Sequence, residues 1–531
     1  MSGTGTDQFS VSPEKKLSIL QLPWPFLALL VAGILRLPIL FIPGVIHNDS
    51  YEYIRAAKSM LQGDWTGGVA PPVYSFCIMV VNSIIGNYEL SGALVSWIFG
   101  VLVVVPVYFL AKRVFDERVG RFASLLAAVQ PTLYFYSGSV LSDSIYYFFL
   151  ILSVYLGWLA FERGRFVTVA LFGLSSTISY LIRPEAIGFL FIFSVWVLCV
   201  NPPHEKRSLF RRVALTVMAI VCFVAFSSPY LVALRKEFGR WEISRKASIS
   251  LVAPDENTGK AVMSEQGEKP GHVSAAKKKK ISLSSFVSEP VEVAKRLSTG
   301  FVQVLFKYQQ ALNPILFLLA IIGLVRRRED KSFWKIDLYL LSYCFFFFVL
   351  VLPFFWITKR HTSHLVLVAL PWATYGLVRV ADFVRMKTKI GFLRNHGILI
   401  CLVLVMVTLF AEGFIDRINS RKHRMIRKEA GVWMRDNLPK GPVISRLPHE
   451  AFYGDMDWIN VQDYDYDNIR RKAIDRNAKY LVVDEDVANS KADFVRSLEE
   501  HSFDLVYVKQ KKDQKIFIFS FRQQKESQSK Q

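Results

Sequence analysis

The sequence predicts a polytopic α-helical membrane protein with about 11 transmembrane helices, two juxtamembrane helices in the first outer loop and a small C-terminal α/β domain. The chain has 531 residues, of which 52% are hydrophobic, and its mean hydropathy is +0.29. Apolar runs of about 20 residues recur, which is the length needed to cross a bilayer core of roughly 30 Å. The net charge of +21 is spread over short loops, which indicates membrane orientation and contact with membrane lipids; no nucleic-acid partner is expected.

Eleven apolar runs are candidate spans. They cover residues 20–42, 89–111, 122–137, 142–161, 166–182, 186–201, 212–234, 301–325, 336–357, 363–381 and 394–416. One further run, residues 73–85, holds about 13 residues and would be only roughly 20 Å long as a helix, which is short for a span. "PPVYSF" at 71–76 gives this run the proline start that is typical of surface helices.

The charged loops decide whether residues 73–85 cross the membrane. If they do not cross, five short loops rich in Lys and Arg all lie on the side of the N-terminus, and they are residues 112–121, 162–165, 204–212, 326–335 and 385–395. This arrangement satisfies the positive-inside rule at every turn, whereas a crossing would turn each of these loops outward. We therefore expect residues 73–85 on the outer surface of a cell inner (plasma) membrane and the N-terminus in the cytoplasm.

The assignment of spans and loops also predicts the domain boundaries. Residues 1–19 form a cytoplasmic N-terminus, and residues 20–420 form the transmembrane domain, with outer loops at 43–88 and 235–300. After residue 420 the pattern changes, because an amphipathic helix at 424–439 is followed by runs typical of strands. These runs are residues 441–446, 478–485, 503–510 and 515–521. The alternation and the closing hairpin predict a soluble extracytoplasmic α/β domain over residues 421–531.

Two charged segments favour ordinary interpretations. The four lysines at 277–280, in "GEKPGHVSAAKKKK", are more typical of a solvated run than of a specific anion site. The acids of "DYDYD" at 463–467 are more typical of a solvated turn than of a cation site.

The first outer loop opens with "HNDSYEYIRAAKSMLQGDW", residues 47–65, which has a helical pattern. Asp49 precedes Glu52 by three residues, the spacing of a capping box in which Asp replaces Ser or Thr. Asp49 could therefore cap a surface helix. A carboxylate held at a helix start could also accept a proton from a hydroxyl nucleophile, and the local pattern leaves both interpretations open.

A second acid and an unusual cation belong to the apolar runs. Asp143, in "SVLSDSIYYFFL" at 139–150, lies at the outer mouth of the fourth span. It is either a helix-start acid stabilised by the helix dipole or a functional acid facing a cavity. Arg36 lies inside the first run, about 10 Å below its outer end by helical rise.

Further cations gather on the predicted outer face. Arg183 and Glu185 flank a proline in "YLIRPEAIGFL", and Lys359, Arg360 and His361 begin the tenth span. Snorkelling anchors are one interpretation of this last group. The positive-inside rule would not place cations here, however, and an anionic lipid headgroup would account for them, because Arg and Lys bind phosphate oxygens and stabilise a leaving phosphate.

Several segments in this order resemble one known superfamily. They are "DSYEYIRAAKSMLQGDW", "PPVYSF", "LSDSIYYF", "YLIRPEAIGFL", "SPYLVALRKEFGRWEISRKAS" and, in the tail, "EAGVWMRDNLPKGPVISRLPHEAFYGD". The chain resembles the GT-C superfamily of integral-membrane glycosyltransferases. More narrowly, it is similar to the bacterial branch related to protein O-mannosyltransferases and to lipid A aminoarabinose transferases. The resemblance covers about residues 20–420.

The resemblance implies a sugar donor linked to a polyprenyl phosphate and transfer on the outer face with inversion at the anomeric carbon. Asp49 matches the first-loop acid to which the family assigns the catalytic role. Asp143 matches the second outer acid, which helps to arrange acceptor, donor or metal. The expected catalytic residues are Asp49, Asp143 and Glu52; the expected donor phosphate ligands are Arg183, Lys359, Arg360, His361 and Arg36; Glu185 and Tyr51 are expected to support the cavity.

Departures from the family pattern narrow the activity. A "WWD" triplet is absent, which disfavours an oligosaccharyltransferase, and the loop 235–300 is too short for the luminal insertion of eukaryotic protein mannosyltransferases. Asp49 is followed by Ser50 and not by a second acid. The acceptor therefore stays open among a lipid, a glycan and a protein hydroxyl or phosphate. The ligand spacing demands no cofactor; a divalent metal stays open, with Asp143 as its ligand.

Two other classes of protein also have many spans. A flippase or transporter for polyprenyl-linked sugars would more often show broken helices around a midplane site. A membrane assembly subunit without catalytic activity would not need two acids and a cation cluster on the same side. The polar features of this chain crowd one face, which favours chemistry at the membrane surface.

Overall fold

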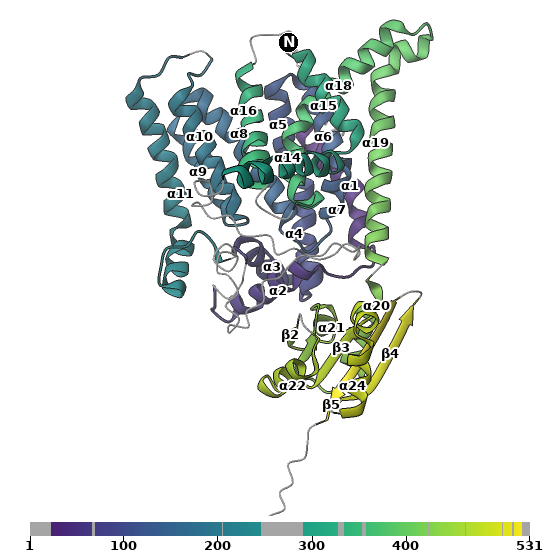
Figure 1. Ribbon diagram of the computed structural model, residues 1–531. Coiled ribbons are helices and arrows are strands. Elements are labelled where there is room, and N and C mark those ends of the chain that lie inside the picture. Colours follow the sequence, from purple (N-terminus) through teal and green to yellow (C-terminus); the bar gives the residue numbers. More distant parts are fainter. Residues whose placement is uncertain are drawn as a thin grey trace, which may run out of the picture.

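The structure, a computed structural model, describes residues 23–65, 70–203, 205–245, 290–327, 334–352, 357–422, 424–461, 464–501, 503–511 and 514–522. In this part of the chain, long helices form a bundle, and a small sheet domain lies against one end of it (Figure 1). The predictions for the N-terminus before residue 23, for the lysines at 277–280 and for Asp463 lie outside the described residues.

The helices of the bundle mostly follow the apolar runs. They are α1 (Trp24–Arg36), α4 (Tyr88–Leu102), α5 (Val104–Val114), α6 (Glu117–Val129), α7 (Pro131–Tyr136), α8 (Asp143–Arg163), α9 (Phe166–Tyr180), α10 (Ile187–Cys199), α11 (Leu209–Phe238), α14 (Pro290–Leu312), α15 (Pro314–Arg327), α16 (Trp334–Phe345), α17 (Lys359–Thr362), α18 (Val366–Lys387) and α19 (Gly391–Lys422).

Within the described residues, six helices are long and apolar enough to cross a membrane. They cover Tyr88–Val114, Asp143–Arg163, Leu209–Phe238, Trp334–Val351, Lys359–Lys387 and Arg394–Ser420, and the bent pair α14 and α15 would make a seventh. Shorter apolar helices account for other predicted runs, at Trp24–Leu40, Phe166–Tyr180 and Pro184–Cys199. A multi-pass membrane protein is therefore confirmed, whereas the number of eleven spans and their orientation stay predictions.

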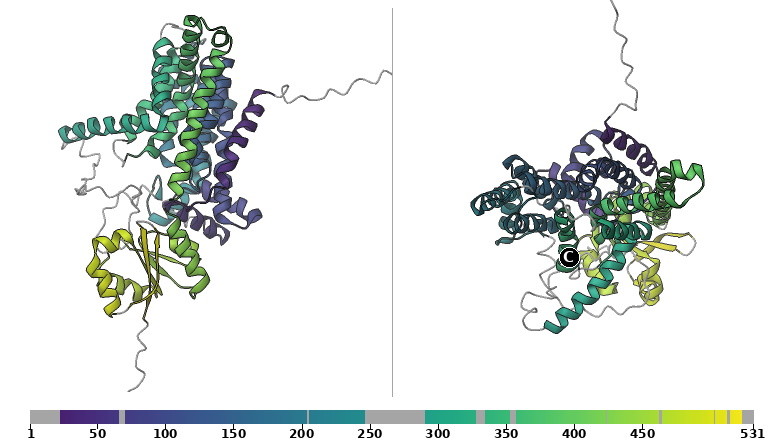
Figure 2. Two further views of the ribbon diagram at one scale, coloured as in Figure 1. Left: turned by 90° about the vertical axis from the view of Figure 1, so that its right-hand side faces the viewer. Right: turned by 90° about the horizontal axis from the view of Figure 1, so that it is seen from above.

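The predicted span 301–325 is wrong as a single helix. α14 and α15 meet at Asn313 and are bent by 104°, so that α14 projects sideways from the bundle (Figure 2). Asn313 has a φ of 78°, a left-handed conformation that Asn tolerates better than most residues. Pro314 begins α15 and disfavours the helical conformation for the residue before it. The pair of Asn313 and Pro314 indicates a break in the helix, which the hydropathy of the run does not reveal.

The close packing of α15 against α18 holds the helix that follows the Lys359–His361 group. A methyl group on Gly323 would lie 2.0 Å from the carbonyl oxygen of Trp372, and one on Gly376 would lie 1.9 Å from that of Leu319. The two backbones therefore approach so closely that only glycine fits at the crossing. Such packing fixes the start of α18 relative to the rest of the bundle.

The loop predicted to be the first outer one contains two helices, α2 (Asn48–Leu61) and α3 (Val73–Ile85), at the end of the bundle nearest the sheet domain (Figure 1). A capping box of Asp49 and Glu52 is not formed, because the N-cap of α2 is His47, two residues before Asp49. The Ser50 hydroxyl accepts the His47 backbone N–H at 3.0 Å and donates to the Val140 carbonyl at 2.7 Å. The Asp49 side chain is thereby left for contacts outside its own helix.

The chain after α19 forms a five-stranded sheet in the order β2-β1-β3-β5-β4. β1 (Val443–Ser445) is parallel to β2 (Trp458–Asn460) and β3 (Tyr480–Asp484), whereas β5 (Gln514–Phe521) is antiparallel to β3 and to β4 (Phe503–Lys511). The helices of this part are α20 (Met425–Asn437), α21 (His449–Tyr453), α22 (Tyr466–Asp475), α23 (Glu485–Ser490) and α24 (Ala492–His501). The four predicted strands are confirmed; the short β2 was missed, because three residues carry too little alternation to be detected.

Candidate functional site

Charged residues that are far apart in the sequence meet at the end of the bundle that faces the sheet domain. Asp49 comes from the first turn of α2, Asp143 begins α8, Arg183 follows α9, and Arg360 lies in the single turn of α17. The structure thus brings together both predicted outer acids and two of the predicted cations. We call these four residues the charged cluster.

Arg360 is the centre of the charged cluster. Its Nη1 lies 2.7 Å from Oδ2 of Asp49, and its Nη2 lies 3.0 Å from Oδ2 of Asp143. Its Nε also donates to Oδ2 of Asp143 at 3.1 Å. One guanidinium therefore bridges both carboxylates, and its planar fork is suited to such bidentate contacts.

Arg183 binds the other oxygen of the buried acid. Its Nη2 lies 2.7 Å from Oδ1 of Asp143, and its guanidinium lies 5.2 Å from the ring centre of Tyr146. Glu185 is a more distant neighbour, at 3.9 Å from Nη1. Arg183 is thus held by a carboxylate on one side and an aromatic face beneath it, a favourable setting for a cation of low exposure.

Burial separates the roles of the two acids. The side chain of Asp143 is fully buried, whereas that of Asp49 is 22% exposed and that of Arg360 is 15% exposed. A buried carboxylate is tolerated when cations and hydrogen bonds satisfy it, and two guanidinium groups do so here. Asp143 is therefore enclosed by its two cationic partners, whereas the Asp49 carboxylate is partly open to solvent.

Sequence reasoning missed a layer of hydroxyl groups that supports the cluster. The Tyr53 hydroxyl lies 2.8 Å from Oγ of Ser142, directly before Asp143. The Tyr147 hydroxyl is hydrogen-bonded to Ser363, and the Ser363 hydroxyl donates to the Arg360 carbonyl at 2.5 Å. Tyr53 and Tyr147 each lie four residues after an acid of the cluster, so helical spacing from Asp49 and Asp143 was the signal that could have found them.

The remaining predicted site residues lie around the cluster. Lys359 is half-exposed, and its Nζ lies 3.7 Å from Oδ2 of Asp416 on α19. His361 bonds through Nδ1 to the Thr358 hydroxyl at 2.8 Å. Tyr51 packs edge-on against Trp458 of β2, with ring centres 5.3 Å apart. Tyr51 therefore contacts the sheet domain, which the sequence did not predict.

The prediction that Glu52 assists Asp49 is not supported. Nη2 of Arg55 lies 2.6 Å from Oε2 of Glu52, one helical turn away on α2. The carboxylate is thus paired on its own helix, because residues three apart face each other there.

The side chain of Arg36 binds backbone carbonyl groups inside the bundle and is not placed as a phosphate ligand would be. This side chain is fully buried. Nε donates to the Ala128 carbonyl at 3.0 Å and Nη2 to the Ala127 carbonyl at 2.6 Å, and Nη1 is bonded to the Gly100 carbonyl. The guanidinium joins α1 to the ends of α4 and α6. The earlier assignment of Arg36 to the donor phosphate is therefore corrected.

Replacement of Arg36 by Gln should lower stability and leave donor binding unchanged. Three carbonyls would lose a charged donor, and each such hydrogen bond contributes about 1.5–3 kcal/mol. Thermal unfolding in detergent should show a loss of several degrees, while the donor KM stays at the wild-type value. A raised donor KM with unchanged thermal stability would restore the phosphate-binding role.

The charged cluster does not fit a divalent metal in this arrangement. Among the described residues, no group of three His, Cys, Asp or Glu side chains could hold a metal ion. Both carboxylates of the cluster already bind a guanidinium group, whose positive charge opposes a second cation.

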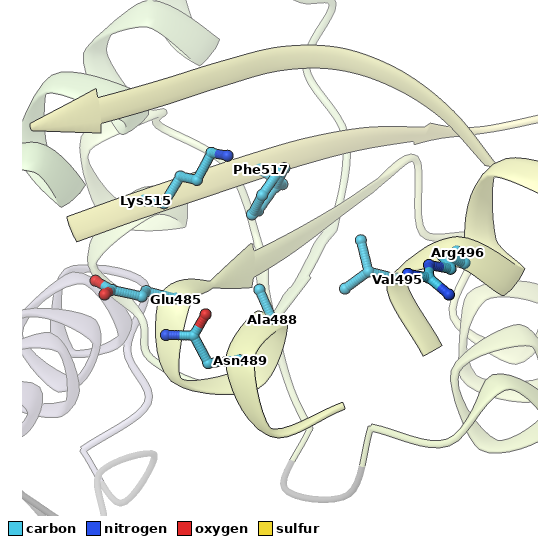
Figure 3. Close-up of a pocket in the computed structure, with 7 residues that line it drawn as sticks. All are labelled: Glu485, Ala488, Asn489, Val495, Arg496, Lys515 and Phe517. Carbon is cyan, nitrogen blue, oxygen red and sulfur yellow. The ribbon is translucent and has the colours of Figure 1, made fainter. Parts of the chain in front are cut away.

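A separate hollow of about 280 Å³ lies in the sheet domain (Figure 3). Side chains from α23, α24 and β5 line it, and they are Glu485, Ala488, Asn489, Val495, Arg496, Lys515 and Phe517. All of its residues belong to the sheet domain, so it is distinct from the charged cluster.

The fold is thus a helical membrane bundle in which α2 carries one acid, α8 begins with a buried acid and two arginines lie between them. Residues 69–232 match the model of the dolichyl-phosphate-mannose-protein mannosyltransferase family. This matched stretch holds Asp143 and Arg183 of the cluster. Among curated proteins, none matches the chain significantly.

Solved structures match nearly the whole chain. The oligosaccharyltransferase AglB of Archaeoglobus fulgidus, in complex with an inhibitory peptide and a dolichol-phosphate, has a TM-score of 0.58 at 14% identity, covering 90% of this chain and 71% of AglB. ArnT of Cupriavidus metallidurans, bound to undecaprenyl phosphate, has a TM-score of 0.57 at 14% identity, covering 93% of this chain and 98% of ArnT. The chain has the fold of the GT-C membrane glycosyltransferases, and the resemblance found in the sequence is confirmed.

Proposed function

We propose that the protein transfers a sugar from a polyprenyl-phosphate-linked donor to an acceptor on the outer face of the membrane, with inversion at the anomeric carbon. The observation that carries this proposal is the Arg360 bridge between Asp49 and Asp143, with Arg183 on the second oxygen of Asp143. Support comes from the fold, which AglB and ArnT share, and from the polyprenyl-type phosphates named in their structures.

The charges of the cluster suit a phosphate whose charge increases during the reaction. Two carboxylates and two guanidinium groups balance one another. As the bond between the anomeric carbon and the phosphate oxygen breaks, its electron pair passes to the phosphate. In this proposal Arg360 and Arg183 stabilise that charge, and Lys359 and His361, which neighbour Arg360 in the chain, bind the same phosphate. Asp143 stays bound to both guanidinium groups, so that Arg360 can exchange its contact with Asp49 for one with the phosphate without leaving the cluster.

Asp49 serves the acceptor. Its carboxylate is the more exposed of the two, and it shares Arg360 with Asp143. When Arg360 turns toward the leaving phosphate, the hold on Asp49 weakens and the carboxylate becomes a stronger base. The acceptor hydroxyl attacks the anomeric carbon from the face opposite the phosphate, and its proton passes to Asp49. An acceptor that is already ionised would need Asp49 only for orientation.

One experiment tests the class of activity and identifies the acceptor. The purified protein, reconstituted in lipid vesicles, is incubated with a radiolabelled polyprenyl-phosphate sugar and with lipid, glycan or peptide acceptors. We expect label on one acceptor class and stoichiometric release of polyprenyl phosphate. Label that moves across the vesicle membrane while still attached to its donor would establish a flippase instead, and an intact, unmoved donor would favour an assembly subunit.

A further inference from the structure

The sheet domain forms hydrogen bonds with the backbone of Ile46, three residues before Asp49. Nε2 of His449 lies 3.0 Å from the carbonyl oxygen of Ile46, and the Ile46 backbone N–H donates to the Tyr453 hydroxyl at 3.0 Å. Both side chains belong to α21. The two polar groups of one peptide residue are thus satisfied by a domain that lies about 400 residues later in the chain. We call His449 and Tyr453 the Ile46 clamp.

The surroundings make the Ile46 clamp rigid. Ile46 and His449 are buried, at 3% and 0% exposure. The Tyr453 hydroxyl in turn donates to Glu89 of α4 at 3.0 Å. Lys428 adds a contact to the Gly44 carbonyl at 3.2 Å. A buried hydrogen bond is costly to break, and the bond to Tyr453 is reinforced because that hydroxyl is also bonded to Glu89.

An ion-pair network joins α21 to α20 and to the end of β3. Arg427 of α20 lies 2.8 Å from Oε1 of Glu450 and 2.7 Å from Oδ2 of Asp484. Arg446 also binds Asp484, at 2.8 Å. Burial lowers the pKa of His449 well below its usual range. The ring is therefore neutral, and Nε2 carries the hydrogen that the Ile46 carbonyl accepts.

The clamped residue is close to the charged cluster. Ile46 is followed by the N-cap residue His47, and Asp49 lies in the first turn of α2. On the other side, Ser50 is bonded to Val140, three residues before Asp143. The start of α2 is thus held between the sheet domain and the bundle, and the angle of its first turn decides where the Asp49 carboxylate points.

We infer that the C-terminal sheet domain positions Asp49 through the Ile46 clamp, so that His449 and Tyr453 are positioning residues of the site. The inference rests on the proposed function as far as catalysis is concerned. It gives the sheet domain a role in the reaction at the membrane, exerted through the backbone of Ile46.

The test compares Tyr453→Phe and His449→Leu with two matched variants in full-length protein in lipid nanodiscs. Tyr480→Phe removes a hydroxyl of the same domain, which donates to the Pro439 carbonyl and lies outside the clamp. His449→Gln keeps an N–H donor. Hydrogen exchange is followed over residues 47–54, together with donor KM and kcat.

We expect Tyr453→Phe and His449→Leu to speed exchange over residues 47–54 by about fivefold to tenfold, the effect of losing one buried hydrogen bond. We also expect kcat to fall about tenfold or more at an unchanged donor KM, because misplacement of a catalytic group affects the chemical step. His449→Gln should recover part of both effects, and Tyr480→Phe should show neither.

Unchanged exchange in both clamp variants would overturn the inference, and so would faster exchange with wild-type kcat. Absence of sugar transfer by the unmodified protein would instead refute the proposed function. In that case the exchange measurement alone still decides whether the sheet domain holds the start of α2.

Discussion

Replacement of Arg360 by Gln should lower kcat/KM for the donor by about 10²–10³-fold, the cost of removing one preorganised group that stabilises transition-state charge. Arg360 contacts both acids of the cluster. The variant loses the cation for the leaving phosphate and the bridge that orients Asp49. Arg360→Lys keeps the charge but not the planar fork, so its activity should lie between those of Gln and Arg.

Arg55→Gln is the matched control for Arg360. Arg55 lies on the same outer-loop helix as Asp49, and it pairs with the single carboxylate of Glu52. Its side chain is exposed, so removal of its charge should change donor kinetics by less than about twofold. Measurement of kcat/KM at low and high salt completes the test, because a phosphate contact weakens as salt rises. An Arg360→Gln variant with activity like that of Arg55→Gln would exclude Arg360 from the mechanism.

Replacement of Asp49 by Asn should lower kcat by about 10²–10⁴-fold if the acceptor is a hydroxyl, because that is the usual contribution of a general base. The helix should be intact, since the N-cap of α2 is His47 and the bond from His47 to Ser50 does not involve Asp49. Asn is close to Asp in size and can still accept a hydrogen bond from Arg360. The donor KM and the melting temperature should therefore stay near the wild-type values.

Glu52→Gln provides the control for Asp49, because it neutralises an acid of the same helix that is paired with Arg55. We expect nearly full transfer activity from this variant. Asp49→Asn with wild-type kcat toward a hydroxyl acceptor would disprove the base role. If the acceptor is an ionised phosphate, the expected loss for Asp49→Asn is smaller and is confined to acceptor KM, so the acceptor identified by labelling decides which result applies.

Much of the helical framework could be read from hydropathy, because a residue that faces lipid must be apolar and a span must have a minimum length. Hydropathy did not predict the bend at Asn313, because the backbone changes direction there within one predicted span. It also failed to set the start of α2, because a cap depends on one residue's backbone conformation and not on the spacing of two acids.

The sequence by itself determined the membrane class, the presence of a terminal α/β domain and the candidates Asp49, Asp143, Arg183 and Arg360. Their order among the helices and the chemistry of charged groups at span ends were sufficient for that. Only the tertiary structure decided that Arg360 bridges both acids, that Arg36 joins helices, that Glu52 pairs with Arg55 and that α21 holds Ile46. Apart from the pair of Glu52 and Arg55, which lie one turn apart on α2, these contacts join residues tens to hundreds of positions apart. Side-chain contacts over such distances depend on helix packing, which the local pattern of a chain does not encode.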